Sequence, residues 1–98
     1  MARLDVFKSI NGEYLLDCQA DILDHLRTRF VVPLALLDDG PKVAARLNPI
    51  FEIEGVSLIM YTQFAMTVPI QDIQHYITSL GDHHTRIMDA IDMLITGY

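Results

Sequence analysis

The sequence predicts one small domain over residues 1–98, mostly antiparallel β-sheet with a single C-terminal helix. Three observations predict this fold class. The length of 98 residues fits one domain. Two dipeptides typical of tight turns, Asn11-Gly12 and Glu54-Gly55, each lie between apolar segments. The final segment has apolar residues at helical spacing. Together they predict a small barrel that carries one helix.

The first hairpin is predicted from residue alternation and turn chemistry. Polar and apolar residues alternate from Arg3 to Phe7, as in a half-buried strand. Asn11-Gly12 favours a tight turn, because both residues tolerate positive φ. The returning strand is predicted from Tyr14 to Gln19.

A polar break over residues 24–28 precedes the longest apolar run. The continuous apolar stretch from Phe30 to Leu37 predicts a strand covered on both faces. Pro33 within it indicates an edge position or a bulge, since proline cannot donate a ladder hydrogen bond. A turn is predicted at residues 38–41, Asp-Asp-Gly-Pro.

The second half of the chain is also predicted to contain two strands joined by a tight turn. We expect an extended segment over Val43–Leu47. Strands are predicted over Pro49–Glu54 and Val56–Thr62, on either side of the second turn. Residues 64–70 are expected to be loop or strand leading into a helical turn.

The last segment predicts an amphipathic helix. Asp82 is the expected N-cap, because its carboxylate can accept hydrogen bonds from free backbone N–H groups. Gly97 is a natural helix stop. Asp89 and Asp92 lie on a face away from the apolar stripe. The stripe consists of Ile87, Met88, Ile91, Leu94 and Ile95.

Composition excludes several functional classes. The net charge is −6, and the seven Lys and Arg residues are scattered, whereas nucleic-acid binders gather basic residues on one face. We therefore expect no direct nucleic-acid binding. No apolar run is long enough to span a bilayer, so no membrane association is expected. The acidity fits either solubility or attraction to a basic protein surface.

The cysteine count and the N-terminal segment bear on the compartment. Residues 1–10 lack a basic region followed by an apolar core, so a secretory signal is not expected. The single cysteine, Cys18, excludes an intrachain disulfide. We expect it to be a reduced thiol, half-buried in a strand, in a cytoplasmic protein.

Candidate catalytic and metal-binding groups are few. Cys18 and His25 are the only residues that suggest a nucleophile and base, and an inert thiol with a surface histidine explains them better. The adjacent pair His83-His84, with His75 nearby, cannot chelate from one helix face, because neighbouring helical residues point about 100° apart. The prediction is a protein that is not an enzyme and needs no cofactor or metal.

Three surface features favour a protein partner, although each has a structural explanation. Ile22-Leu23, between two aspartates, is either an exposed apolar pair that a partner can bind or the end of a core strand. Asp89 and Asp92 form part of a binding face, or merely a solvated one. The tail, residues 96–98, is a docking element or a frayed terminus.

Five segments in order resemble the CcdB family. Residues 17–24, DCQADILD, are similar to its D-x-Q-x-D-I-[IL]-D signature. Residues 29–35, RFVVPLA, resemble its proline-containing strand. Residues 47–53, 66–70 and 89–97 resemble the next strand, the segment before the last helix and the end of that helix.

This resemblance implies a function as well as an SH3-like barrel. Members of the family are toxins of type II toxin–antitoxin systems and are not enzymes. They act as homodimers on the A subunit of DNA gyrase and trap that topoisomerase with its DNA cut. A CcdA-like antitoxin neutralises the toxin, and the complex represses its own operon through DNA contacts made by the antitoxin.

The resemblance also implies site residues. The gyrase-binding surface would comprise Ile22, Leu23, Asp89, Asp92, Thr96, Gly97 and Tyr98. Ile91 and Leu94 would lie at the dimer interface, which is expected to be isologous.

The chain departs from the family pattern at Thr96, where tryptophan is expected. A central tryptophan in an interface contributes about 2–4 kcal/mol, or roughly 30- to 1000-fold in affinity. Tyr98 could restore an aromatic anchor, the target surface could differ, or poisoning could be lost. One alternative is therefore a CcdB-like module that binds antitoxin without poisoning gyrase. A second alternative is a MazF-like endoribonuclease, which has the same barrel but would need positive charge along its RNA path.

Overall fold

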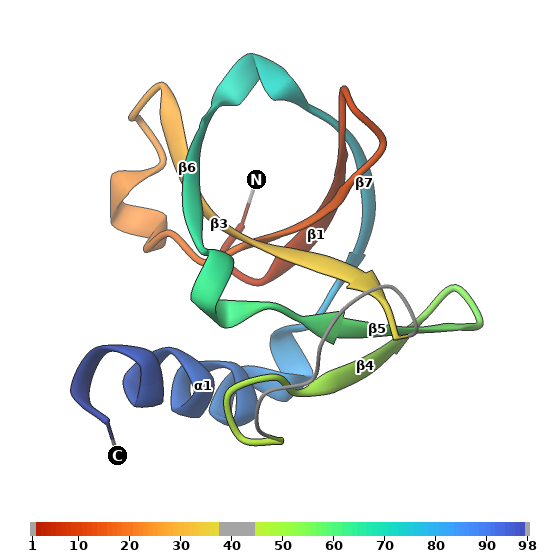
Figure 1. Ribbon diagram of the computed structural model, residues 1–98. Coiled ribbons are helices and arrows are strands. Elements are labelled where there is room, and N and C mark those ends of the chain that lie inside the picture. The colour runs from red at the N-terminus through yellow and green to blue at the C-terminus, as the bar shows by residue number, and fades with distance from the viewer. Residues whose placement is uncertain (1, 38–44, 98) are drawn as a thin grey trace.

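The computed structural model describes residues 2–37 and 45–97. Within these ranges all strand pairs are antiparallel, in the order β4-β5-β3-β2-β1-β7, with β6 paired to β3. In Figure 1 the sheet curls into a ring, and the helix α1 lies below it, beside β4 and β5. The predicted barrel with a C-terminal helix is therefore confirmed. The strands are β1 Asp5–Ser9, β2 Tyr14–Asp17, β3 Thr28–Leu36, β4 Ile50–Ile53, β5 Val56–Met60, β6 Met66–Pro69 and β7 Ile73–Ser79, and α1 is His84–Thr96.

Four short 3-10 turns connect these elements. They are η1 Asp21–Leu23, η2 Thr62–Phe64, η3 Ile70–Asp72 and η4 Gly81–His83. The predicted strand and helical turn after residue 64 correspond to β6 and η3. Within the described residues, no helix has both the length and the hydropathy needed to cross a bilayer.

Both predicted hairpin turns are present. Gly12 has φ +84° between β1 and β2, and Glu54 and Gly55 have φ +53° and +79° between β4 and β5. The first strand starts later than predicted, at Asp5, because Leu4 has φ +71°. Leu4 is buried there, donates its N–H to the Asp17 carbonyl and accepts from the Leu80 N–H, so two neighbouring segments fix this conformation.

Pro33 lies in an interior strand, which corrects the expected edge or bulge. It pairs with Leu15 of β2 on one side. On the other side β3 changes partner: residues 28–31 pair with β6, and residues 34–36 pair with β5. Pro33 lies between these two ladders, where a missing N–H breaks no strand pair.

Two further predictions need correction. Asp82 is not the N-cap of α1, because an additional 3-10 turn, η4, precedes the helix and contains it. His83 occupies the cap position, without a side-chain hydrogen bond. Residues 45–47 form a turn instead of the expected extended segment. The turn predicted at residues 38–41, with Val43 and Ala44, lies outside the described residues.

The apolar core lies between the sheet and α1. Ile87 and Ala90 are the buried residues of the helix, and Met88 and Ile91 pack partly against the same cluster. The last turn of the helix lies outside this core: Leu94 is 44% exposed and Ile95 is 72% exposed. The core cluster consists of Leu4, Val6, Leu16, Val32, Leu34, Phe51, Ile53, Leu58, Met60, Leu80, Ile87 and Ala90.

Candidate partner-binding surface

The turn η1 presents two apolar side chains to solvent. Ile22 is 84% exposed and Leu23 is 41% exposed, and no residue of η1 is buried. In Figure 1 this turn projects from the left side of the molecule. Exposed apolar groups of this kind mark contact sites for partners when they lie together. Ile22 and Leu23 are therefore not the end of a core strand.

Hydrogen bonds that involve two buried side chains hold η1 from the interior side. Gln19 is buried and donates its Nε2–H to the Leu23 carbonyl over 2.9 Å. The Gln19 N–H donates to Asp17 Oδ1 over 3.0 Å. Asp17 is itself fully buried and forms an ion pair with Arg29, whose Nε and Nη2 both donate to Asp17 Oδ2. Buried polar side chains thus hold the exposed apolar turn in place.

Arg3 connects η1 to the start of α1. Its backbone N–H donates to Asp21 Oδ1 over 2.7 Å. Its guanidinium Nη2 lies 3.2 Å from Nε2 of His84, the first residue of α1. A guanidinium only donates, so His84 must accept through Nε2 in this contact.

The outward face of α1 carries the polar residues predicted for the site. At about 100° per residue, Asp89, Asp92 and Thr96 lie within roughly 60° of one another. All three are exposed, and they lie opposite Ile87 and Ala90, which face the core. The Thr96 hydroxyl donates to the Asp92 carbonyl over 2.6 Å.

The end of α1 is exposed and sharply terminated. Gly97 has φ +81°, and its N–H donates to the Met93 carbonyl over 2.9 Å. This left-handed cap is the predicted helix stop. Thr96 and Gly97 are exposed, whereas Tyr98 lies outside the described residues.

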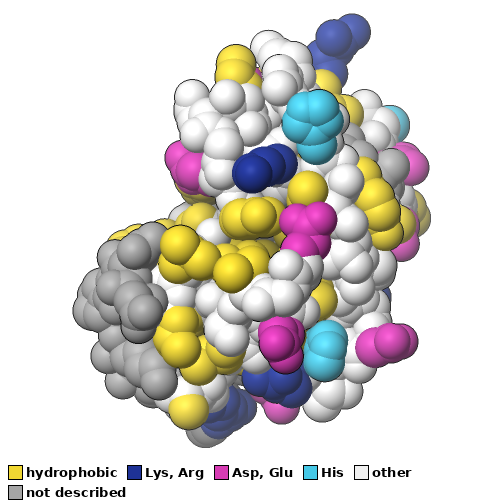
Figure 2. All heavy atoms as spheres, turned by 90° about the vertical axis from the view of Figure 1, so that its right-hand side faces the viewer, with side chains coloured by type: hydrophobic (Ala, Val, Ile, Leu, Met, Phe, Trp, Pro, Cys, Tyr) yellow, Lys and Arg dark blue, Asp and Glu magenta, His cyan; other side chains and the backbone are white. Residues whose placement is uncertain are grey.

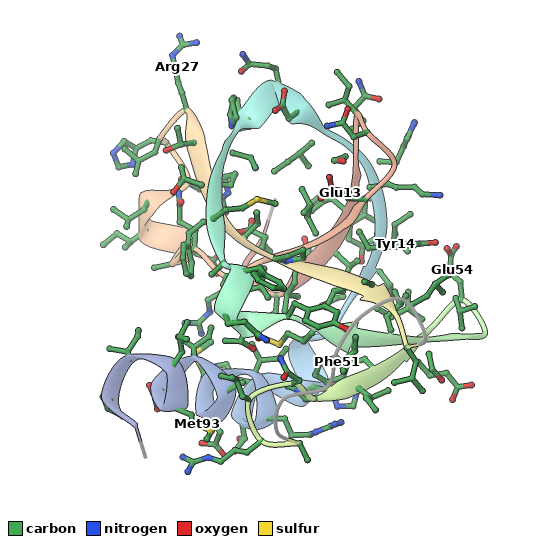
Figure 3. All side chains as sticks on the ribbon, in the orientation of Figure 1. Glu13, Tyr14, Arg27, Phe51, Glu54 and Met93 are labelled. Atoms are coloured by element: carbon green, nitrogen blue, oxygen red, sulfur yellow. The ribbon has the colours of Figure 1, made fainter. Side chains whose placement is uncertain are left out.

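Asp89 has basic neighbours within the chain. It lines a small cavity of about 110 Å³ together with Arg46 and Arg86. The Arg86 guanidinium donates to the Ile50 carbonyl and lies 4.7 Å from the centre of the Phe51 ring. Phe51 lies between the sheet and the helix, as Figure 3 shows.

The predicted site residues occupy two regions. Figure 1 shows η1 and the C-terminal end of α1 on the same side of the molecule. Asp89 and Asp92, however, face away from the barrel. Of the predicted dimer residues, Ile91 is partly covered by the core and Leu94 is exposed. Phe64 of η2 is also exposed, at 56%, and nothing in its sequence context predicts this.

Cys18 and the histidines have different surroundings. Cys18 follows β2 instead of lying within it, and burial, with the Asp17 charge as the second cause, raises its pKa from 9.0 to about 12. A thiol with this pKa stays protonated and is a poor nucleophile. His25 is exposed, and His83 packs against the Phe51 ring. In the described ranges, no three His, Cys, Asp or Glu residues are grouped to hold a metal ion.

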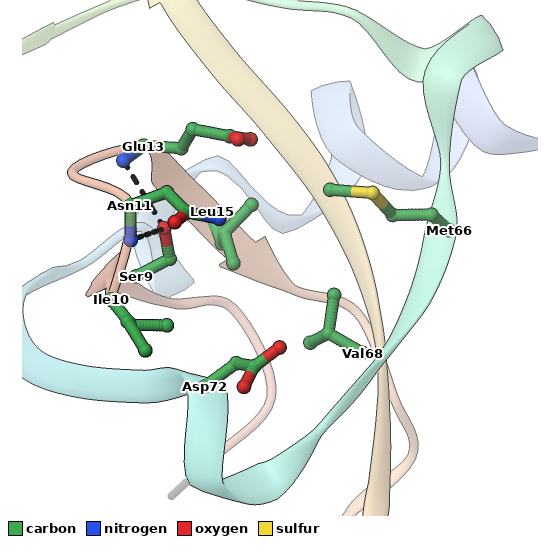
Figure 4. Close-up of a pocket in the computed structure, with 8 residues that line it drawn as sticks. All are labelled: Ser9, Ile10, Asn11, Glu13, Leu15, Met66, Val68 and Asp72. Carbon is green, nitrogen blue, oxygen red and sulfur yellow. Dashed lines mark hydrogen bonds between the residues drawn. The ribbon is translucent and has the colours of Figure 1, made fainter.

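Two further features of the surface are the distribution of basic side chains and a cavity near the first hairpin turn. Figure 2 shows Lys and Arg side chains at the top, centre and bottom of the face opposite η1, with those at the bottom next to each other. A cavity of about 150 Å³ lies beside the turn between β1 and β2, and Figure 4 shows the residues that line it. Ser9 Oγ accepts from the N–H groups of Asn11 and Glu13 at its edge, and Leu15, Met66 and Val68 supply apolar walls.

Two solved structures share this architecture at low sequence identity. A structure described as Mycobacterium tuberculosis toxin MazF-mt6 has a TM-score of 0.77 and 14% identity, over 95% of this chain and 96% of that one. An endoribonuclease from a mycobacterial species has a TM-score of 0.77 and 11% identity, over 97% of this chain and 90% of that one. At these identities the likeness shows the fold alone.

The family itself is identified by the sequence. The model of the CcdB protein family matches residues 3–97 and so includes η1, the ring and the whole of α1. That span contains every predicted site residue except Tyr98. The chain belongs to the CcdB family, a family of toxins from toxin–antitoxin systems.

Proposed function

We propose that this toxin binds the A subunit of DNA gyrase, traps the enzyme with cleaved DNA, and is neutralised by a CcdA-like antitoxin. The observation that carries the proposal is the exposed apolar pair Ile22-Leu23 on a turn fixed by buried polar groups. An apolar group held in water in one conformation favours binding, since little ordering remains to be done when the partner arrives.

The contact would combine two regions. Ile22 and Leu23 supply apolar area on one side, and the end of α1 supplies Thr96, Gly97 and Tyr98 on the same side of the molecule. Asp92, with Asp89, would meet basic groups of gyrase at the edge of the contact. Because these residues lie on the outward face of α1, we infer that the target wraps around the helix end.

We further propose that the toxin is a homodimer. A two-fold interface would bury Leu94, which is exposed in one chain, next to the partly covered Ile91. Pairing would help a domain whose own core is small. The antitoxin would cover surface that overlaps the gyrase contact, so that the two partners exclude each other.

The residue at position 96 supports a second candidate function, an antitoxin-binding module without gyrase poisoning. Thr96 is too short to fill a pocket that accepts tryptophan, and its hydroxyl already donates to Asp92. RNA cleavage is less well supported, because the chain is acidic and its Lys and Arg residues are scattered along the sequence.

The deciding experiment is expression in bacteria with and without the candidate antitoxin, while chromosomal DNA breaks are scored. Gyrase poisoning predicts breaks that disappear on antitoxin co-expression or in a gyrase-resistant strain. Growth inhibition with intact DNA and cleaved RNA would favour an endoribonuclease. Absence of toxicity, with antitoxin binding retained, would favour the second candidate.

A further inference from the structure

The apolar turn η1 contributes no residue to the buried core. No residue of Asp21–Leu23 is buried, so the core does not fix the position of the turn. Local hydrogen bonds close it: Leu23 donates to Ala20, Asp24 donates to Asp21, and Leu26 donates to Leu23. A single turn of this kind is only marginally stable alone. Contacts from outside the turn must therefore select its conformation.

The Gln19 side chain provides such a contact from the protein interior. Its Oε1 accepts from the Phe30 N–H over 2.9 Å, and its Nε2 donates to the Leu23 carbonyl over 2.9 Å. One amide thus bridges strand β3 and the last residue of η1. Its own backbone is held by Asp17 Oδ1. Gln19 is buried, so water does not compete freely for these bonds.

We propose that Gln19 is a positioning residue, which clamps η1 to β3 and thereby holds Ile22 and Leu23 in the orientation that meets the partner. The inference rests on the proposed function only for the identity of that partner. At neutral pH the Gln19 amide can accept at one end and donate at the other. A glutamate would still accept from Phe30, but its ionised carboxylate would repel the Leu23 carbonyl.

The test uses Gln19→Glu in the full-length protein, with hydrogen exchange as the first readout. At neutral pH we expect the Asp24 and Leu26 amides to exchange about tenfold faster, because one buried hydrogen bond is lost. Amides of the β1–β2 ladder should keep their protection. As the pH falls through the pKa of the introduced carboxylate, its protonated form can donate to Leu23, so the ratio of wild-type to variant protection should return towards one. A loss and recovery confined to η1, with the β1–β2 ladder unchanged at every pH, separates positioning of the turn from a general loss of stability.

Gln74→Glu is the matched control, since Gln74 is exposed on β7 and the charge change is the same. It should leave the protection of η1 unchanged at every pH. If Gln19→Glu does not fold, Gln19→Met removes both hydrogen bonds without adding charge and should give the same local loss. Unchanged protection of Asp24 and Leu26 in a folded Gln19 variant would overturn the proposal, as would an equal loss across the whole sheet.

Binding to the purified gyrase A subunit is the second readout. We expect Gln19→Glu to bind about tenfold more weakly than wild type at neutral pH, with Gln74→Glu unaffected. If wild type itself does not bind gyrase, the proposed function fails, and the exchange measurements still decide whether Gln19 positions η1. If wild type binds and a loosened η1 does not weaken binding, the positioning role is wrong.

Discussion

The guanidinium of Arg29 donates twice to the carboxylate of Asp17, and both side chains are fully buried. This pair lies directly below the segment that presents Ile22 and Leu23. Asp17 accepts from Gln19 at its other oxygen, so the same carboxylate serves both the barrel and the binding turn.

Removing one partner of this pair should be strongly destabilising. In Asp17→Asn the Arg29 charge stays buried without its counter-ion, which costs about 3–5 kcal/mol. We expect the free energy of unfolding, measured with urea, to fall by this amount. The double variant Asp17→Asn, Arg29→Met should lose less than the two single changes combined, because no charge remains buried. A loss below about 1 kcal/mol for Asp17→Asn would contradict the assigned importance of the pair.

Ile22→Asp should abolish binding to gyrase without unfolding the protein. The side chain is 84% exposed, so its replacement changes the free energy of unfolding by about 0.5 kcal/mol or less. Calorimetric titration of the gyrase A subunit measures the loss. Ile10→Asp is the matched control, since Ile10 is also exposed but lies in the turn after β1. Equal binding by Ile22→Asp and wild type would remove η1 from the contact.

Deletion of Gly97 and Tyr98 should abolish growth inhibition while the domain stays folded. The buried residues of α1, Ile87 and Ala90, precede the deletion by about two to three helical turns. Growth after induced expression measures toxicity, and thermal unfolding and light scattering check the fold and the dimer. If the shortened protein is equally toxic, the tail takes no part in the mechanism.

Thr96→Trp should tighten binding to gyrase by roughly 30-fold or more, because a tryptophan at an interface centre contributes about 2–4 kcal/mol. The side chain at position 96 is exposed, so the larger ring meets no core atoms. Titration calorimetry measures the gain, and Thr96→Val serves as a control for loss of the hydroxyl. No gain with Thr96→Trp would indicate that this toxin contacts its target differently from its relatives.

Cys18 should make stability depend on pH in the alkaline range. Burial raises its pKa from 9.0 to about 12, so the folded state holds this proton more tightly than the unfolded state. Its contribution is fully present below pH 9 and is lost as the pH rises through 12. Wild type should therefore lose more stability than Cys18→Ala between these values, as measured by urea unfolding at each pH. Parallel curves would show that the thiol is not desolvated.

The parts of the fold that sequence predicted have local causes. The turns at Asn11-Gly12 and Glu54-Gly55 follow from residues that accept positive φ, and α1 follows from its apolar spacing. The start of α1 was missed because η4 is a single 3-10 turn, too short to produce a periodic pattern.

The missed parts of the site have long-range causes. Asp17 and Arg29 are twelve residues apart, and nothing in the sequence indicates that a charged pair would be fully buried. The β2–β3 register brings them together by pairing Asp17 with Val31. The exposure of Phe64 likewise depends on how η2 packs against α1. The exposure of Ile22 was suggested by its position between aspartates, with a strand end as the alternative, and the family resemblance favoured exposure.

The change of partner strand at Pro33 bears on how this protein unfolds. Strand β3 belongs both to the ring, through β2 and β6, and to the layer that carries α1, through β5. Neither half keeps a complete set of backbone hydrogen bonds without this one strand. The ring and the helix-bearing layer should therefore melt together in one all-or-none transition, so a cell protease would meet either the intact toxin or a fully open chain.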